Sequence, residues 1–221
     1  MAVSFTGFGE GAVEFYDGIV ADNSKAYWTD HRDVYETDVR APMLALLAEL
    51  AEEFADMGRP KVFRPYRDVR FAKDKSPYKT HCGAVIEHAR GGGAYYVQLG
   101  SEGLAVGGGC YHMASDQLAR YRTAVAEDRR GKELQGILGR LSRTGWEIHG
   151  EQLRTAPRGF TADHERIDLL RRKALYGMVA FEPDDALHER RTLDRVKKSW
   201  RQIRPLNDWV ADHVGQPDSQ E

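Results

Sequence analysis

Apolar residues recur at helical spacing through the first third of the chain, so this part is expected to be helical. The first helix is predicted in EGAVEFYDGIVAD and the second in NSKAYWTDHRDVYETDVR, with Asn23 or Ser24 as its N-cap. A third helix is predicted in APMLALLAELAEEFADM, which Gly58 and Pro60 should end. Its predicted apolar face consists of Leu44, Leu47, Leu50, Ala51 and Phe54.

The middle of the chain instead alternates apolar and polar residues, which is the pattern of strands. The first predicted strand is KVFRPYRDVRF, and Pro65 within it indicates an edge strand or a bulged one. GAVIEHA is a second strand, and AYYVQLGSEGLAVGGG predicts a hairpin. In the first strand the alternation places these residues on one surface: Arg64, Tyr66, Asp68 and Arg70. The opposite surface would carry Phe63, Arg67, Val69 and Phe71.

Helical and strand patterns mix in the second half of the chain. Helices are predicted in SDQLARYRTAVAED, GKELQGILGRLSRT and DHERIDLLRRKA. Strands are predicted in WEIHGEQL and LYGMVAF. A long charged helix should run from Pro183 to Val214, with Pro205 kinking or breaking it.

This order of elements predicts an α+β fold, with N- and C-terminal helices packed around a central, mostly antiparallel sheet. A chain of 221 residues is long enough to bury a large core, and one domain is the better expectation. We expect a single α+β domain over residues 1–214, followed by a frayed tail at residues 215–221.

The composition is that of an ordinary globular protein. The chain carries 32 Lys and Arg against 34 Asp and Glu, which gives a net charge of -2 and a pI near 6.5. Binding of nucleic acid would therefore have to come from a local patch. Cys82 and Cys110 lack the spacing of a zinc or redox motif, and we recognise neither a signal peptide nor a membrane span. The expectation is a soluble, cytoplasmic protein.

One short stretch concentrates positive charge despite the negative total. In FRPYRDVRFAKDKSPYKTH, residues 63–81, six side chains are Arg or Lys and only Asp68 and Asp74 are acidic. Guanidinium groups bind phosphate or carboxylate in a bidentate manner, and lysines add mobile point charges. The predicted anion contacts are Arg64, Arg70, Lys73, Lys75 and Lys79. Tyr78 and Thr80 would donate from their hydroxyls, and Asp68 would orient an arginine.

A plainer interpretation of the same stretch stays open. Alternating Arg and Asp residues on a strand often form a cross-strand ladder of ion pairs, each worth about 0.2–1 kcal/mol. Lysines in a turn are often simply solvated. No Gly-x-x-x-x-Gly precedes Lys79, so the stretch is not a P-loop. The excess of positive over negative residues favours the anion site over the ladder.

Supporting candidates lie outside this stretch. The three glycines of VGGGCYHM form either a nest of N–H groups for an anion or a bulge that needs positive φ. His112, which follows them, can act as an acid or base, although a lone histidine is more often structural. Lys173 either points inward, where it would need a carboxylate or an anionic ligand, or is solvated at a helix end. Arg154 adds a further positive charge.

Four motifs occur in the order in which an uncharacterised family carries them. They are DNSKAYWTDHRDVY, FRPYRDVRFAKDKSPYKTH, VGGGCYHM and GEQLRTAPRGFTADHERIDLLRRKALYG. On these motifs the chain resembles the family known as domain of unknown function 2461, from about residue 5 to about residue 212. The resemblance implies a shared fold. It supplies no function, because the family has no agreed activity.

Three functions follow from these candidates. The first is a pocket, binding or catalytic, for a phosphorylated or otherwise anionic small molecule at the basic stretch. The second is nucleic-acid binding by the same patch, with Tyr66 and Tyr78 stacking on bases. The third is docking of a partner by the C-terminal helix, whose apolar stripe consists of Leu193, Val196, Trp200 and Ile203. We expect no cofactor and no metal site, and the sequence leaves the oligomeric state open.

Overall fold

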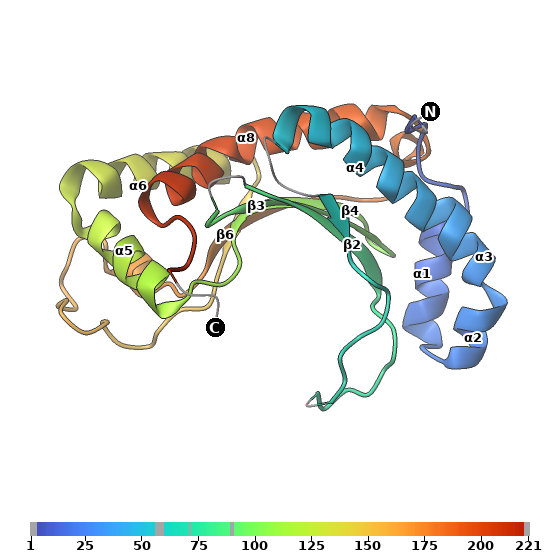
Figure 1. Cartoon of the computed structure of the whole chain (residues 1–221), viewed down its shortest axis with the longest axis horizontal. Coiled ribbons are helices and arrows are strands. Elements are labelled where there is room, and N and C mark those ends of the chain that lie inside the picture. Colours follow the sequence, from blue (N-terminus) through green and yellow to red (C-terminus); the bar gives the residue numbers. More distant parts are fainter. Residues whose placement is uncertain (1–3, 56–59, 71, 89–90, 219–221) are drawn as a thin grey trace. The chain divides into compact units, whose positions relative to one another are not determined.

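The computed structural model describes residues 4–55, 60–70, 72–88 and 91–218 (Figure 1). The first elements are α1 (Ala12–Ala21), α2 (Lys25–Asp30), α3 (Arg32–Val34), the π-helical η1 (Tyr35–Arg40) and α4 (Ala41–Phe54). The central strands are β1 (Pro60–Val62), β2 (His81–Glu87), β3 (Ala94–Gly100) and β4 (Gly103–Cys110). After them come α5 (Ser115–Ala126), α6 (Asp128–Arg143), β5 (Glu147–His149), α7 (Ile167–Leu170) and β6 (Leu175–Phe181). The last elements are the 3-10 helix η2 (Asp185–His188) and α8 (Arg191–His213).

The strands form one six-stranded antiparallel sheet in the order β1-β2-β3-β4-β6-β5. At one edge β1 pairs with β2, with Lys61 opposite Val85. At the other edge β5 pairs with β6, with Ile148 opposite Gly177. Helices precede and follow the sheet in the chain, so the predicted α+β fold with N- and C-terminal helices is confirmed.

The chain forms two compact units, each built from separate stretches of sequence. Unit 1 comprises Met1–Ile86, Tyr96–Val106 and Ala180–Lys198, and unit 2 comprises Glu87–Tyr95, Gly107–Val179 and Ser199–Glu221. β3, β4, β6 and α8 each contribute residues to both units. The single domain expected over residues 1–214 stays a prediction.

The N-terminal helices of unit 1 begin and pack largely as their sequence predicts. Ser24 is the N-cap of α2, and its hydroxyl accepts a hydrogen bond from the Tyr27 N–H at 3.1 Å. The predicted apolar face of α4 is wrong at Leu44, which is 44% exposed. The buried face instead carries Met43, Leu46, Leu47, Leu50 and Phe54, a helical spacing that leaves Leu44 on the outside. The helix already ends at Phe54, and Gly58 lies outside the described residues.

The C-terminal helix α8 starts later than the sequence predicts, because the short helix η2 and a turn precede it. Pro205 lies inside α8 and does not end it, although it has no N–H to donate to the preceding turn. The four residues of the predicted apolar stripe are at most 2% exposed. In unit 2 the Trp200 ring lies 5.1 Å from the ring of Tyr95. None of the helices in the described part of the chain has the length and apolar character needed to cross a bilayer.

The segment after α8 is held by Arg120 of α5. The Arg120 guanidinium donates to the carbonyl oxygens of Val214 and Gln216, both at 2.6 Å, and to the Asp218 carboxylate at 2.9 Å. The tail expected to fray from residue 215 is therefore bonded to the fold as far as Asp218. Residues 219–221 lie outside the described part of the chain.

Candidate functional site

The basic segment, defined here as residues 63–80, leaves the sheet after β1 and returns to it at β2 (Figure 1). β1 ends at Val62, and among the described residues beyond it one isolated bridge, between Tyr66 and Tyr78, pairs the two arms of the segment. The edge or bulged strand predicted over KVFRPYRDVRF therefore ends already at Val62, because Pro65 cannot donate to a ladder and the chain turns out of the sheet there. Residues 63–67 and 77–80 are called the stem, and residues 68–76 the tip.

Tyr78 anchors the stem to the N-terminal helices. The Asn23 side chain bonds both backbone groups of Tyr78, donating to its carbonyl at 3.1 Å and accepting from its N–H at 3.0 Å. The Tyr78 ring stacks on Trp28 with centroids 4.5 Å apart and planes 9° from parallel. Because Tyr78 is only 4% exposed, its ring belongs to the core.

The charges of the tip are largely paired within the segment. The Asp68 carboxylate accepts two bonds from the Arg70 guanidinium, at 3.0 Å from Nε and 2.7 Å from Nη2. Arg67 bonds Asp74, and Lys75 Nζ donates to a backbone carbonyl of the tip at 2.9 Å. Bonds from the neighbouring arginines hold the pKa of both carboxyls below the usual range. Asp68 thus orients an arginine, and the tip fits the ion-pair interpretation.

Two lysines, Lys61 of β1 and Lys79 of the stem, lie over the ring of Phe63, and the charge of Arg64 acts on Lys79. Lys79 Nζ lies 5.2 Å and Lys61 Nζ 5.7 Å from the ring centroid, and Lys79 Nζ donates to the Arg64 carbonyl at 2.9 Å. None of the three cations forms an ion pair with a carboxylate that the structure describes. Burial lowers the pKa of Lys79, and the charges of Arg64 and Lys61 lower it further. Lys61, Arg64 and Lys79 are called the stem cluster.

Polar groups of the sheet lie beside the stem cluster. His81, the first residue of β2, is half-buried, and burial followed by the charge of Lys79 lowers its pKa. A Cβ on Gly83 would lie 2.6 Å from the Tyr96 hydroxyl and 3.3 Å from the Phe63 ring, so these groups share one face. The Tyr96 hydroxyl donates to Gln98 Oε1 at 2.8 Å. An imidazole, a phenol and an amide therefore accompany the three cations.

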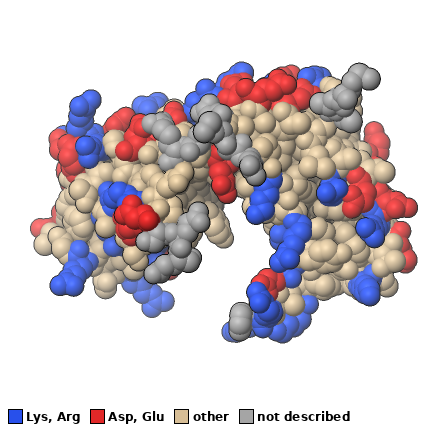
Figure 2. Space-filling model, viewed as in Figure 1, with Lys and Arg blue, Asp and Glu red and all other residues tan. Residues whose placement is uncertain are grey.

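Of the predicted anion contacts, the structure brings Arg64 and Lys79 together. Arg70 and Lys75 contact other groups of the tip, as described above. Lys73 is exposed and has no hydrogen bond or ion pair with the described residues, and Thr80 is exposed at the end of the stem. Figure 2 shows positive side chains along the projecting basic segment, with acidic atoms among them.

Sequence reasoning missed Lys61 and His81, which flank the basic segment on either side. One signal was available for Lys61, which stands two positions before Phe63 and therefore shares its face if the strand is regular. No such signal existed for His81, because its approach to Lys79 depends on how the segment returns to the sheet.

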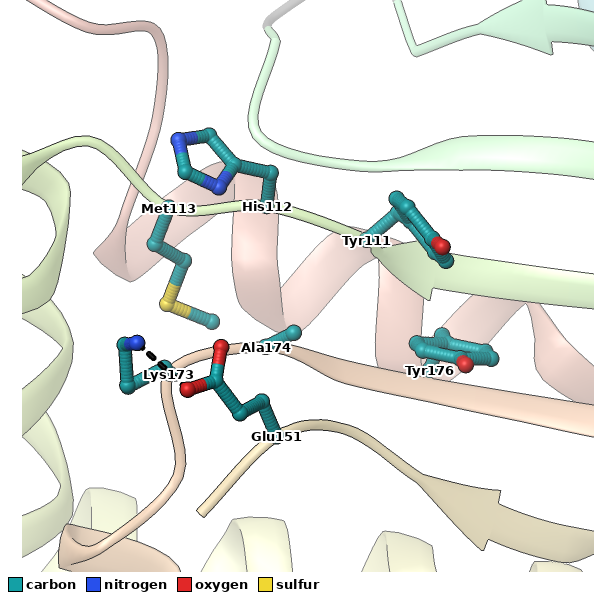
Figure 3. Close-up of a pocket in the computed structure, with 7 residues that line it drawn as sticks. All are labelled: Tyr111, His112, Met113, Glu151, Lys173, Ala174 and Tyr176. Atoms are coloured by element: carbon teal, nitrogen blue, oxygen red, sulfur yellow. Dashed lines mark hydrogen bonds and ion pairs between the residues drawn. The ribbon is translucent and has the colours of Figure 1, made fainter. Parts of the chain in front are cut away.

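Two of the three supporting candidates line a cavity of about 400 Å³ in unit 2 (Figure 3). Lys173 and His112 are among its lining residues, together with Met113, Glu151, Tyr111, Ala174 and Tyr176. Lys173 Nζ lies 2.6 Å from Glu151 Oε1, so the lysine has a carboxylate partner although its side chain is partly exposed. Arg154 is exposed in the loop between β5 and α7 and is not among the lining residues.

The three glycines of VGGGCYHM lie within β4 and serve close packing. A Cβ on Gly107 would lie 2.3 Å from Met178 Sδ of β6, and one on Gly108 would lie 2.9 Å from Ile203 of α8. Only Gly109 has a positive φ, 125°. The glycines therefore let the sheet approach its neighbours closely.

The remaining candidates for catalysis or metal binding give no site. Cys82 and Cys110 are free and buried, and burial raises the pKa of each thiol to about 11, which keeps it unreactive near neutral pH. Within the described residues, no three His, Cys, Asp or Glu side chains lie close enough together to hold a metal ion.

Comparison with models of known protein families assigns the chain to one of them. The model of a family described as "Conserved hypothetical protein (DUF2461)" matches residues 11–209. The chain belongs to this family. The match spans nearly the whole chain and confirms the resemblance seen in the four sequence motifs. A search of curated proteins found no match. The description of the DUF2461 family names no activity, so a function for this chain has to be inferred from its own residues.

Proposed function

We propose that this DUF2461 protein binds a phosphorylated or otherwise anionic small molecule at the stem cluster of unit 1. The observation that carries the proposal is that Lys61 and Lys79 lie over Phe63, that the charge of Arg64 acts on Lys79, and that none of the three has a carboxylate partner among the described residues. Three like charges repel one another, and partial burial of Lys79 adds a desolvation cost. A bound anion removes both costs, because it supplies the missing negative charge.

The chemistry of the cluster suits a phosphoryl group. The Arg64 guanidinium offers a planar pair of donors, and each lysine offers a mobile point charge. Each charge-assisted hydrogen bond is worth about 1.5–3 kcal/mol, so two or three of them give affinities from roughly millimolar to micromolar. His81 can add a fourth donor at lower pH.

The proposal is tested by calorimetric titration of the full chain with sulfate, phosphate, nucleotides and sugar phosphates. Lys79→Ala and Arg64→Ala each remove one contact and should weaken binding by about 10-fold to 150-fold, from the energies above. Lys73→Ala is the matched control, because it removes the same charge from the same segment at an exposed tip position. It should leave the affinity within about twofold of the parent.

Two results would overturn the proposal. In one, none of the anions binds the parent at millimolar concentration. In the other, Lys79→Ala and Lys73→Ala weaken binding equally, which is the behaviour of a diffuse positive surface.

Nucleic-acid binding is the second candidate, and the exposure of Tyr66 favours it. The Tyr66 ring is 50% exposed and lies 6.0 Å from Trp28, so one face is open for a base to stack on. A gel-shift titration at about 50 mM salt is the test, because phosphate contacts are strongest there. Absence of a shift would exclude this function.

The remaining expectations have less support. The apolar stripe that suggested docking by α8 is buried within the chain, so it offers no surface to a partner. A cytoplasmic location stays a prediction and is compatible with two free, buried cysteines.

A further inference from the structure

The cavity of unit 2 holds an ion pair that backbone pairing fixes in place. The Lys173 N–H donates to the Glu151 carbonyl at 2.7 Å, and an isolated bridge joins the neighbouring residues Gln152 and Arg172. Lys173 and Glu151 therefore project from two paired segments, and their side chains meet at 2.6 Å (Figure 3). A pair held this way needs little ordering when a ligand arrives.

This ion pair keeps hydrogen-bonding capacity for a ligand. The Lys173 side chain is 39% exposed and that of Glu151 is 68% exposed, so solvent reaches both groups. An ammonium group has three donors, and Glu151 uses one of them. The described residues leave the second carboxylate oxygen of Glu151, Oε2, without a partner. One wall of the cavity thus presents free donors and a free acceptor side by side.

Another wall of the cavity is aromatic. Tyr111, directly after β4, and Tyr176 of β6 have ring centroids 5.3 Å apart with planes 46° from parallel. Figure 3 shows the two rings one above the other, with Ala174 between them and the ion pair and the Met113 side chain beside the pair. Tyr111 is 79% exposed, which is unusual for so large a ring, whereas Met113 and Ala174 are buried. The cavity therefore combines an apolar floor, an aromatic wall and one charged pair.

The opposite charges of Lys173 and Glu151 determine which kind of ligand fits the cavity. A simple anion is attracted by Lys173 and repelled by Glu151, and the reverse holds for a simple cation. A zwitterion avoids this conflict, because its carboxylate can face Lys173 while its ammonium faces Glu151. An α-amino acid carries both groups on one carbon. An aromatic side chain on that carbon supplies the flat surface that suits the two tyrosine rings.

We propose that this cavity binds a free amino acid with an aromatic side chain. Its carboxylate bonds Lys173, its ammonium group bonds Glu151, and its ring packs against Tyr111 and Tyr176. The cavity volume of about 400 Å³ is within the range of small-molecule sites. The two tyrosine rings, Met113 and Ala174 supply apolar surface beside the polar groups of His112, Glu151 and Lys173. The inference is independent of the stem cluster, since every residue involved belongs to unit 2.

Titration calorimetry of the full chain with phenylalanine, tyrosine and tryptophan tests the proposal. Three analogues separate the contacts: 3-phenylpropionate lacks the ammonium group, 2-phenylethylamine lacks the carboxylate, and alanine lacks the ring. At least one aromatic amino acid should bind, and its three partial analogues should each bind at least tenfold more weakly.

Variants then assign the binding to this cavity. Lys173→Met and Glu151→Gln each remove one charge and should weaken binding at least tenfold. Tyr111→Ala should also weaken binding, and because Tyr111 is exposed the variant should fold like the parent. The matched control is Lys132→Met, which breaks an exposed pair with Asp128, 2.8 Å apart, on α6 of the same unit. It should bind like the parent, as should Lys79→Ala of the stem cluster.

Three results would overturn the inference. The first is no binding of any aromatic amino acid at millimolar concentration. The second is equal binding of 3-phenylpropionate and phenylalanine, which would mean that Glu151 makes no contact with an ammonium group. The third is binding that Lys173→Met, Glu151→Gln and Tyr111→Ala leave unchanged, which would place the ligand elsewhere.

Discussion

Replacement of Asn23 by alanine tests how the basic segment is held to the helices of unit 1. The Asn23 side chain forms two hydrogen bonds with the backbone of Tyr78, at 3.1 and 3.0 Å, across 55 positions of sequence. The stack of Tyr78 on Trp28 is not touched by the substitution. The variant therefore isolates the contribution of one amide group to the anchoring of the stem.

The expected loss follows from the two bonds. A neutral hydrogen bond contributes about 0.5–1.5 kcal/mol net, so two contribute about 1–3 kcal/mol. Tyr78 is only 4% exposed, so its N–H and carbonyl gain little compensation from water once the amide is gone. We therefore expect Asn23→Ala to lower the free energy of unfolding by about 2–3 kcal/mol. Asn23→Asp keeps the acceptor for the Tyr78 N–H but sets a charged oxygen against the Tyr78 carbonyl, so it should not restore the stability of the parent.

Two assays measure the effect. Urea unfolding should show a lower midpoint with an unchanged slope. Limited trypsin digestion under native conditions should cut the basic segment faster, since it holds six Arg and Lys residues and the stem opens more often. If Asn23→Ala changes the free energy of unfolding by less than about 0.5 kcal/mol and leaves the cleavage rate unchanged, Asn23 does not anchor the stem.

Three further predictions concern charge and packing. His81 has a lowered pKa and is neutral near pH 7. Sulfate affinity, measured by calorimetric titration, should therefore rise as the pH falls from about 8 to about 5 and the imidazole becomes charged. His81→Gln should remove this rise. The Arg190 guanidinium lowers the pKa of Glu49 to about 2 in the folded chain. The ionised Glu49 carboxylate therefore stabilises the fold at pH values above the pKa that Glu49 has in the unfolded chain. This contribution is lost as the pH falls from about 4.5 towards 2. Glu49→Gln should flatten the fall in urea midpoint over that range. Ile203 is fully buried, so Ile203→Ala should cost about 2–5 kcal/mol in urea unfolding, and a loss below about 1 kcal/mol would contradict its place in the core.

The sequence predicted those parts of the fold in which local spacing and packing agree. Helical spacing located α1 and α4, and the strand–turn–strand pattern located β3 and β4. The strand predicted through Arg70 failed, because alternation continues past Pro65 while the backbone leaves the sheet there. What holds the stem instead is a side chain 55 positions away, Asn23, which no local pattern reveals.

Prediction of the candidate sites had a similar limit. The contact between Asp68 and Arg70 is local and could be anticipated from two alternating charges. The approach of Lys61 to Lys79 arises only when the segment returns to the sheet, so the sequence identified Lys79 and missed its neighbour. The pairing of Lys173 with Glu151 joins residues 22 positions apart, and sequence reasoning could state only that an inward lysine needs a carboxylate.

Within the described part of the basic segment, some charges have carboxylate partners and others have none. Both acidic residues, Asp68 and Asp74, lie in the tip and pair with arginines, so the tip needs no ligand to balance its ion pairs. The stem has no carboxylate of its own, although a single acidic residue there would relieve the repulsion around Lys79. A fold that leaves like charges together gives up stability locally, and this is common where a bound ligand supplies the opposite charge. The stem cluster, rather than the equally numerous positive residues of the tip, is therefore the place to look for the anion.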